Sequence, residues 1–541
     1  MTGYKRFGLQ LASHLGLTEE VISLANHLSL GLAQDPAALV DERLRDVDHT
    51  ADDGGSTVLL PLFPSDVINQ VVQCTLGYAF NSRGHGTLYL RCSDDLAVCS
   101  RAYLHEDEPW VHDVCGAVTE NVSDAFGVPT RAVADVLPST YSPSLPANER
   151  DLETYRGVEV ARLARGATRQ YFLKYNIDLD EPTERRVYVR YLRTAVTLVD
   201  AYEELLSKNE IDATIAFDDH YIYGGVALAV SANHGIPAYS VELGFLNETL
   251  VFGRWTNRNS LPMFTDTETV RRILSSPLSP DEQQRTEELL ADRVDGKRTK
   301  YLYSSQTDVS VDRSDDRTLV GMFTNLTWDA SLEVQSAPFP NMFEWLERTI
   351  NLFEGRDDVE LVVKTHPAEK ARVTREPVKE WIEEHLGPLA SNVTVLPPDT
   401  EVNTYELIDD LDLGVVYSST VGLEMVTQGV PVVVGGDSHY CDLDITYDPV
   451  TASEYVELLS SPADIELAEE MPVRAERYVN FFFFDKHIDY PFVTTDENDE
   501  NHLSYISHDE LVPGNRNFDL IVEGILAGEP VLNRRARPVQ H

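Results

Sequence analysis

Two short polar turns carry the side chains best suited to chemistry, and each turn follows an apolar run. The first is KTHP at residues 364–367, after VELVV, and the second is SST at residues 418–420, after LGVVY. Lysine, histidine and small hydroxyl groups bind anions, and so do the backbone N–H groups at the start of a helix. The two turns therefore predict a site for a pyrophosphate or a nucleoside monophosphate.

The alternation of apolar and polar residues indicates how these turns are positioned. Residues 410–440 predict one β-α-β unit, in which three hydroxyl-bearing residues lie between the first strand and the helix: Ser418, Ser419 and Thr420. Lys364 and His366 end another apolar strand, which Pro367 terminates. An alternative for the KTHP turn stays open, in which the lysine is solvated and the histidine only caps a turn.

Glu424 lies four residues beyond Thr420, on the same face of the predicted helix. It is a candidate to accept hydrogen bonds from the hydroxyls of a ribose. The alternative is that its carboxylate is satisfied within its own helix.

A candidate general base lies in the amino-terminal half, where a strand ends in Asp218, Asp219 and His220 before the segment YIYGG. A hydroxyl that acts as a nucleophile must lose a proton as its new bond forms, and a carboxylate at a strand end is suited to accept it. We prefer Asp219. The alternative is an aspartate pair that caps the following helix.

The length of 541 residues predicts two domains, and strands alternate with helices in both halves. The expected fold class is α/β, with two Rossmann-like, doubly wound domains that face a cleft, an N-terminal helical extension and a helical insertion. The expected boundaries are a helical extension and linker at 1–56, an N-terminal Rossmann-like domain with the helical insertion at 57–265, a connection at 266–316, a C-terminal Rossmann-like domain at 317–460, and C-terminal helices and tail at 461–541.

The chain is strongly acidic, with a formal charge of −46 from 90 acidic and 44 basic residues. Such a surface repels phosphate backbones, which argues against a nucleic-acid partner. Only nine of the basic residues are lysine, and the acidic residues are spread along a chain of ordinary hydrophobic content, 42%. This composition is typical of a cytosol rich in salt, so we expect a halophilic, archaeon-like source.

The five cysteines are odd in number and lack CxxC spacing, which argues against a disulfide framework and a zinc ribbon. The N-terminus has no apolar signal core, and no apolar run has the length of a membrane span. We expect a cytoplasmic protein that is able to associate with the inner face of the cell membrane.

The motifs VVKTHP, YSSTVGLE and GVPVVVGG, within residues 318–440, resemble those of capsule and surface polysaccharide glycosyltransferases with two Rossmann-like domains, the GT-B architecture, including Kdo transferases. They are also similar to motifs of bacterial sialyltransferases and polysialyltransferases, and more distantly to glycerophosphotransferases of teichoic-acid synthesis. The resemblance implies that His366, Ser418 and Ser419 contact the donor phosphate. It also nominates three residues of the loop TNLTWDA: Asn325, Thr327 and Asp329.

The loop has an alternative explanation, in which Asp329 lies near the cap of a helix. In the sialyltransferases the base lies in an acidic-acidic-glycine motif, whereas this chain has histidine, His220, in place of the glycine.

The expected function is transfer of a sugar from a nucleotide-sugar to a surface glycan, polysaccharide or glycolipid. The nucleotide-sugar is a co-substrate, and no resident cofactor or metal is expected because side chains and a helix end meet the charge of the departing phosphate. Two alternatives stay open: a nucleotide-sugar epimerase or polyol-phosphate transferase on a similar scaffold, and a non-catalytic carbohydrate-assembly protein.

Overall fold

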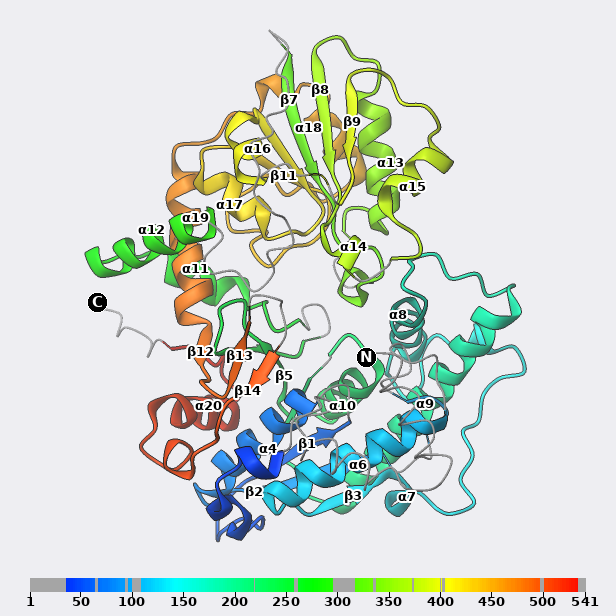
Figure 1. The fold of residues 1–541 in the computed structure, drawn as a ribbon, viewed down its shortest axis with the longest axis vertical. Helices are drawn as coiled ribbons and strands as arrows, with labels where there is room; N and C mark the ends of the chain where they lie inside the picture. Colours follow the sequence, from blue (N-terminus) through cyan, green and yellow to red (C-terminus); the bar gives the residue numbers. More distant parts are fainter. Residues whose placement is uncertain are drawn as a thin grey trace. The chain divides into compact units, whose positions relative to one another are not determined.

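The computed structural model describes residues 36–63, 67–92, 96–99, 109–217, 219–256, 261–294, 317–333, 337–371, 374–398, 400, 404–496 and 501–533. These residues form two compact units (Figure 1). The first unit comprises the described residues before Phe172, residues 177–262, and those after Asp485. The second comprises residues 172–176 and 263–485. The chain therefore leaves the first unit and returns to it near its C-terminal end.

The first unit contains a seven-stranded sheet in the order β12-β6-β5-β4-β1-β2-β3. The five strands from β5 to β3 are parallel, whereas β6 and β12 are antiparallel to their neighbours. The chain builds outward from β1 to β3 and then restarts on the other side with β4, so the strand order reverses between β1 and β4. The strands are β1 (Thr57–Leu62), β2 (Gly86–Arg91), β3 (Thr130–Ala132), β4 (Ala213–Ala216), β5 (Ala238–Leu243), β6 (Thr249–Arg254) and β12 (His487–Asp489).

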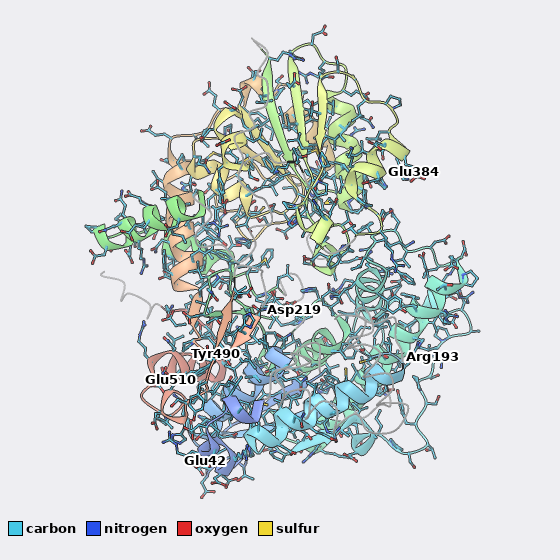
Figure 2. The ribbon with its side chains drawn as sticks, viewed as in Figure 1. Glu42, Arg193, Asp219, Glu384, Tyr490 and Glu510 are labelled. Carbon is cyan, nitrogen blue, oxygen red and sulfur yellow. The ribbon has the colours of Figure 1, made fainter. Side chains whose placement is uncertain are left out.

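Helix α4 (Val67–Asn81) lies at the centre of this unit, and nearly all of its residues are buried. The sheet packs on it, together with α6 (Pro109–Phe126) and the C-terminal α20 (Arg516–Ala527). Tyr490, labelled in Figure 2, pairs its hydroxyl with Thr75 of α4 at 2.7 Å, so the C-terminal segment completes the core. The other helices are α3 (Pro36–Leu39), α7 (Val133–Val136), α8 (Val160–Phe172), α9 (Pro182–Lys208) and α10 (Ile222–Asn233), with 3₁₀ turns at Glu42–Asp46, Glu149–Asp151 and His508–Glu510.

The second unit contains a five-stranded sheet in the order β11-β10-β7-β8-β9, and all of its strands are parallel. The order again reverses at the first strand, between β7 and β10. The strands are β7 (Thr318–Phe323), β8 (Val359–Lys364), β9 (Val393–Leu396), β10 (Leu413–Val416) and β11 (Val432–Val434).

Parallel strands require crossover connections, and right-handed crossovers that run in opposite directions from β7 put helices on both faces of the sheet. In Figure 1, α13 (Met342–Phe353) and α15 (Val378–His385) lie on one side of β7 to β9, with α16 (Thr404–Asp410) and α17 (Val421–Thr427) on the other. A core of fully buried residues fills the space between α13 and the sheet. The remaining helices are α11 (Thr267–Leu274), α12 (Pro280–Val294), α14 (Ala368–Ala371), α18 (Ala452–Leu459) and α19 (Glu470–Asn480), with short helical turns at Ala330–Glu333, Pro462–Asp464 and Phe481–Asp485. A hairpin of β13 (Val493–Thr495) and β14 (Asn501–Leu503) belongs to the first unit.

The predicted fold class, α/β with two parallel-rich sheets, is confirmed. The segment expected to be a helical insertion contains β3, a strand of three residues that is too short to give an apolar run. The expected C-terminal tail also differs, because its part after Asp485 contributes β12 and α20 to the first unit. Residues 1–35 of the helical extension and 295–316 of the connection lie outside the described residues. Within the described ranges, no helix combines the length and the apolar character that crossing a membrane requires.

Candidate functional site

The carboxyl ends of β8, β7 and β10 form one edge of the second sheet. Lys364 pairs with Phe323, which in turn pairs with Val416, so these three residues form one row across the sheet. Asn325 and Ser418 each follow this row by two residues, and the backbone N–H of Ser418 donates to Asn325 Oδ1 at 3.3 Å. The two predicted turns and the loop after β7 therefore meet where the strand order reverses, the place where open α/β sheets bind ligands.

Lys364 is the last residue of β8 and is only 5% exposed. Burial lowers the pKa of its ammonium group, because the charged form loses its hydration. The next residue, Thr365, fixes the strand end, since its backbone N–H and its hydroxyl both donate to the carbonyl of Leu396, at 3.1 and 3.0 Å. The lysine is thus a buried cation in a chain with only nine lysines. An anion that arrives at this edge would stabilise its charged form.

His366 is half-buried, and its Nδ1 accepts the backbone N–H of Ala368 at 3.1 Å. Burial is the main reason that its pKa falls to about 4; Asp329 opposes this change and Lys364 adds to it. The imidazole is therefore neutral at pH 7. Because Nδ1 is an acceptor, the proton lies on Nε2, and the ring acts through this nitrogen as a neutral donor.

The SST turn is held from the loop that follows β11. Tyr440, which is fully buried, donates its hydroxyl to the carbonyl of Ser419 at 2.6 Å, and Ser438 Oγ donates to the carbonyl of Ser418 at 3.4 Å. A side chain at Gly422 would meet the Tyr440 hydroxyl at 2.4 Å, so this position requires glycine. The carbonyls of the turn are thus used internally, and the Ser419 hydroxyl oxygen accepts the backbone N–H of Val421 at 3.4 Å, which leaves the O–H of Ser419 able to donate to a ligand.

The predicted helix after the SST turn is short. Thr420 has helical backbone angles and makes no side-chain capping bond, and α17 has only seven residues. The dipole of so short a helix adds little, so an anion at this edge would depend mainly on the hydroxyl groups of the turn and on the residues at the end of β8.

The three residues nominated in the loop after β7 have different environments. Asn325 supports the SST turn, as described above. Thr327 is fully buried, with its hydroxyl 3.5 Å from the carbonyl of Glu376, so it points into the protein. Asp329 accepts the backbone N–H of Ser331 at 2.9 Å, at the start of the Ala330–Glu333 turn. This contact is that of a helix cap, the alternative that the sequence left open for Asp329.

Glu424 has both carboxylate oxygens engaged within the protein. Arg293 of α12 donates from Nε to Oε1 at 2.8 Å and adds a second, shorter bond from its terminal nitrogen. Tyr405 of α16 donates to Oε2 at 2.8 Å. Glu424 is 5% exposed, and it ties α17 to two other helices. We therefore leave it out of the proposed ligand site.

Sequence reasoning missed three polar residues near this edge. Thr324 is 3% exposed, and its hydroxyl has no hydrogen-bond partner among the described residues. Burial raises the pKa of Glu369 to about 8, so this carboxyl is largely uncharged at pH 7. Burial also raises the pKa of Asp437, to about 6, with Asp442 and Asp448 adding to the effect. All three follow apolar strands within five positions, which is the signal that the sequence offers for them.

In the first unit, Asp219 and His220 follow β4, and Glu242 lies near the end of β5. Asp219, labelled in Figure 2, is fully buried, and its Oδ1 lies 2.6 Å from His220 Nδ1. Its other oxygen, Oδ2, has no hydrogen-bond partner among the described residues. Asp218, the other predicted acid, lies outside the described residues. The sequence thus located an acid–histidine pair but not its third member, Glu242, which lies 22 positions beyond His220.

These three side chains are also the group among the described residues that is able to hold a metal ion, because one ligand atom from each lies within 4.8 Å of the others. Two carboxylates and an imidazole suit Mn²⁺ or Zn²⁺. The same arrangement is suited to take up a proton, with the imidazole orienting the carboxylate.

Residues 286–483 match the family model described as "Capsule polysaccharide biosynthesis protein". Comparison with curated protein sequences gives no significant match. Among solved structures, the chain is similar to the β-Kdo 2,4 transferase KpsC of Thermosulfurimonas dismutans, with 15% identity, 55% of this chain and 85% of that chain covered, and a TM-score of 0.36.

The UDP-GlcNAc 2-epimerase of Methanocaldococcus jannaschii, solved with UDP-GlcNAc and UDP, gives 10% identity, coverage of 79% and 98%, and a TM-score of 0.27. At such scores we assign no residue role from these structures. The family match lies entirely within the second unit, which contains both predicted turns. The resemblance of this segment to capsule polysaccharide biosynthesis proteins, predicted from its KTHP and SST turns, is thereby confirmed.

Proposed function

We propose that this protein is a glycosyltransferase of surface-glycan synthesis, which uses a nucleotide-sugar as its donor. One observation carries the proposal: a buried lysine, a neutral histidine and a serine turn lie at the carboxyl ends of β8 and β10, the two neighbours of the central strand β7, beside the point where the order of the second sheet reverses. Such an edge binds a phosphate group without a bound metal. The family match over the same unit supports a role in capsule polysaccharide synthesis.

The chemical step needs an acid–base group and a site for the leaving phosphate. The acceptor hydroxyl attacks the anomeric carbon of the donor sugar, and the bond from this carbon to the phosphate oxygen breaks. Asp219 takes the hydroxyl proton, and its hydrogen bond to His220 holds the carboxylate in place. Lys364 and His366, with the hydroxyl groups of Ser418 and Ser419, stabilise the charge on the departing nucleotide.

The acceptor belongs to the class of growing glycans or glycolipids. A lipid-linked acceptor would bring the protein to the inner face of the membrane. Because the chain carries a formal charge of −46, we expect it to need molar salt to remain folded. Assays therefore start in molar KCl. A protein that keeps its Tm after dialysis into dilute buffer would contradict the halophilic interpretation.

The proposal is tested first by ligand binding. A thermal-shift screen with CMP, UDP, GDP and CDP in molar KCl should identify one nucleotide that raises the Tm, because a ligand that binds only the native state stabilises it. We expect His366→Ala and the double variant Ser418→Ala/Ser419→Ala to lose most of this shift. Matched controls are His234→Ala and Ser275→Ala, since both residues are exposed.

The second step is product analysis with the matching nucleotide-sugars. A new glycosidic bond is the expected product. A free epimer would indicate a nucleotide-sugar epimerase in place of a glycosyltransferase. Transfer of a phosphodiester would indicate a polyol-phosphate transferase. Nucleotide binding with no turnover of any donor would support a non-catalytic assembly protein. Full transferase activity in both site variants would remove the KTHP and SST turns from the mechanism.

A further inference from the structure

A small pocket lies beside the point where the strand order of the first sheet reverses. Its walls come from the end of β1, from α4, from the residue after β4 and from the start of α10: Pro61, Phe63, Gln70, Gln73, Phe217 and Tyr223. Asn69 and Gly224 complete the lining, and none of these residues is charged. Phe217 is only two positions before Asp219. The pocket therefore belongs to the same sheet edge as the proposed base.

Two glutamine amides give this pocket unused hydrogen-bonding groups. Gln70 is 1% exposed, and neither its Nε2 nor its Oε1 has a partner among the described residues. Gln73 is 2% exposed; its Nε2 donates to the carbonyl of Ile215 at 3.0 Å, whereas its Oε1 has no partner within the described part of the chain. Leaving buried polar groups unpaired destabilises a fold, so such groups call for an explanation.

Aromatic rings form much of the remaining wall. Phe63 and Tyr223 have ring centroids 5.6 Å apart, and both residues are less than 10% exposed, as is Phe217. Tyr223 donates its hydroxyl to the carbonyl of Val98 at 2.8 Å, so this group is already used. The polar groups of the pocket that need a partner are therefore the two amides. They offer one donor and two acceptors, next to apolar ring surface.

We propose that this pocket recognises a hydroxyl-bearing group of the acceptor sugar, with Gln70 and Gln73 as its specificity-determining residues. The cavity has a volume of about 20 Å³, which is room for a single hydroxyl-sized group and not for a sugar ring. A hydroxyl donates one hydrogen bond and accepts others, which matches the unpaired amide atoms. Among the described residues the lining carries no charge, which favours this neutral group over a phosphate or a carboxylate.

This inference rests on the proposed function, because it names the chemistry of the acceptor for that reaction. It also separates the roles of the two units. The second unit would bind an anion through a cation and hydroxyl groups, whereas the first would bind a neutral sugar through amides. Binding of a sugar by the first unit does not depend on turnover, so it is measured on its own.

The test uses the full chain in molar KCl and a panel of methyl glycosides of glucose, galactose and N-acetylglucosamine, with binding followed by saturation-transfer NMR and calorimetry. We expect at least one glycoside to bind the wild type. The variant Gln70→Met keeps the length of the side chain and removes both polar atoms. It should weaken the affinity for that glycoside by about tenfold or more, whereas the affinity for the nucleotide should be unchanged. Gln284→Met is the matched control, since Gln284 is exposed on α12.

Stability gives an independent readout. Removing an unpaired buried amide should leave the Tm unchanged or raise it by about 2–4 °C. A fall in Tm with glycoside binding unchanged would show instead that the amides bind a structural water, and would overturn the proposal. Failure of every glycoside to bind the wild type would do the same. Absence of transferase activity in the wild type, with a glycoside that the wild type binds and that Gln70→Met weakens, would count against the proposed function and not against this pocket.

If Gln70→Met does not fold, a crystal structure of the wild type with the bound glycoside decides the question. The expected result is a sugar oxygen within hydrogen-bond distance of Gln70. The inference would be overturned if a single water occupied that place and the sugar lay elsewhere. It would also be overturned if the sugar bound at crystal concentration only.

Discussion

The two sheets have the same strand order, yet the side chains at their reversal points differ in kind. When the strands of each unit are numbered separately, both sheets read 3-2-1-4-5 across their parallel part. In the second unit the edge carries Lys364, the neutral donor His366 and serine hydroxyls. In the first it carries Asp219 and Glu242 with His220. One edge is suited to an anion, and the other to a proton or a neutral hydroxyl.

This difference shows that the backbone fixes the place of a site and the turn residues fix its chemistry. Both edges lie at carboxyl ends of parallel strands, and both are supported by buried helices. Glu369 is an acidic residue of the second unit, but burial raises the pKa of its carboxyl to about 8. It is therefore largely uncharged at pH 7 and does not alter the contrast. The charge of each edge is therefore set by a few residues at or just after the carboxyl ends of the strands, and single substitutions are able to test it.

The largest effect is expected for Asp219→Asn. The amide keeps the size of the side chain and its contact with His220, but it is unable to accept the acceptor proton, so transferase activity should fall by about 10²–10⁴-fold. Nucleotide binding should be unchanged, because it belongs to the other unit. Steady-state kinetics and calorimetry measure the two quantities. Asp124→Asn is the control, as Asp124 is exposed on α6. Activity within a factor of three of wild type would exclude Asp219 as the base.

A smaller effect is expected for Lys364→Met, which keeps the volume of the side chain and removes its charge. Hydrogen bonds to charged groups contribute about 1.5–3 kcal/mol, so nucleotide affinity should fall by about 10–100-fold. The loss should be largest for nucleotides with a pyrophosphate and absent for the nucleoside. The control is Lys379→Met, because Lys379 makes only a surface pair with Glu383 at 3.8 Å. An equal loss for the nucleoside would mean that the lysine supports the fold and not the phosphate.

The next effect is on stability and concerns Glu369. Its pKa rises from 4.5 to about 8 on folding, so between these pH values the folded protein keeps a proton that the unfolded chain has lost. The contribution to stability is complete below pH 4.5 and is lost as the pH rises through 8. Glu369→Gln imitates the protonated form and should raise the free energy of unfolding at pH 8 by about 4 kcal/mol.

The measurement for Glu369→Gln is the Tm at pH 8 and at pH 5 in molar KCl. The variant should exceed the wild type at pH 8 and approach it at pH 5. Glu406→Gln, on an exposed position of α16, should show no such difference. A variant that is less stable at both pH values would mean that the carboxylate form of Glu369 is the one that stabilises the fold.

Much of the fold could be predicted from the sequence because buried parallel strands read as apolar runs. The apolar runs expected before the KTHP and SST turns are the strands at 359–364 and 413–416, and the helix of the β-α-β unit predicted within residues 410–440 is α17. The three-residue strand β3 and the returning strand β12 were missed. Such short strands bury few side chains of their own, and their pairing depends on partners far away in the chain.

For the candidate site, the positions of residues could likewise be predicted from the sequence, whereas their contacts could not. The strand-end residues Lys364, His366 and Ser418 could be found, because position after a strand is visible in the sequence. Environment is not visible there, so the bonds of Glu424 to Arg293 and Tyr405 could not be foreseen, since those partners lie 131 and 19 residues away. The roles of the predicted residues stay predictions until the variants are measured.

The smallest expected effect is that of removing metal ions by chelation. A large loss of activity in this experiment would contradict the contrast between the two sheet edges. If Asp219, His220 and Glu242 handle a proton and hold no metal, dialysis against EDTA should leave turnover within about twofold, since the acid–base contribution of a carboxylate requires no metal. EDTA saturated with Mg²⁺ is the matched control. A loss of activity that Mn²⁺ or Zn²⁺ restores would place a cation between these three side chains. The first sheet edge would then hold a cation, and the contrast would lie in how each unit supplies a positive group: through a bound ion in the first and through its own lysine in the second.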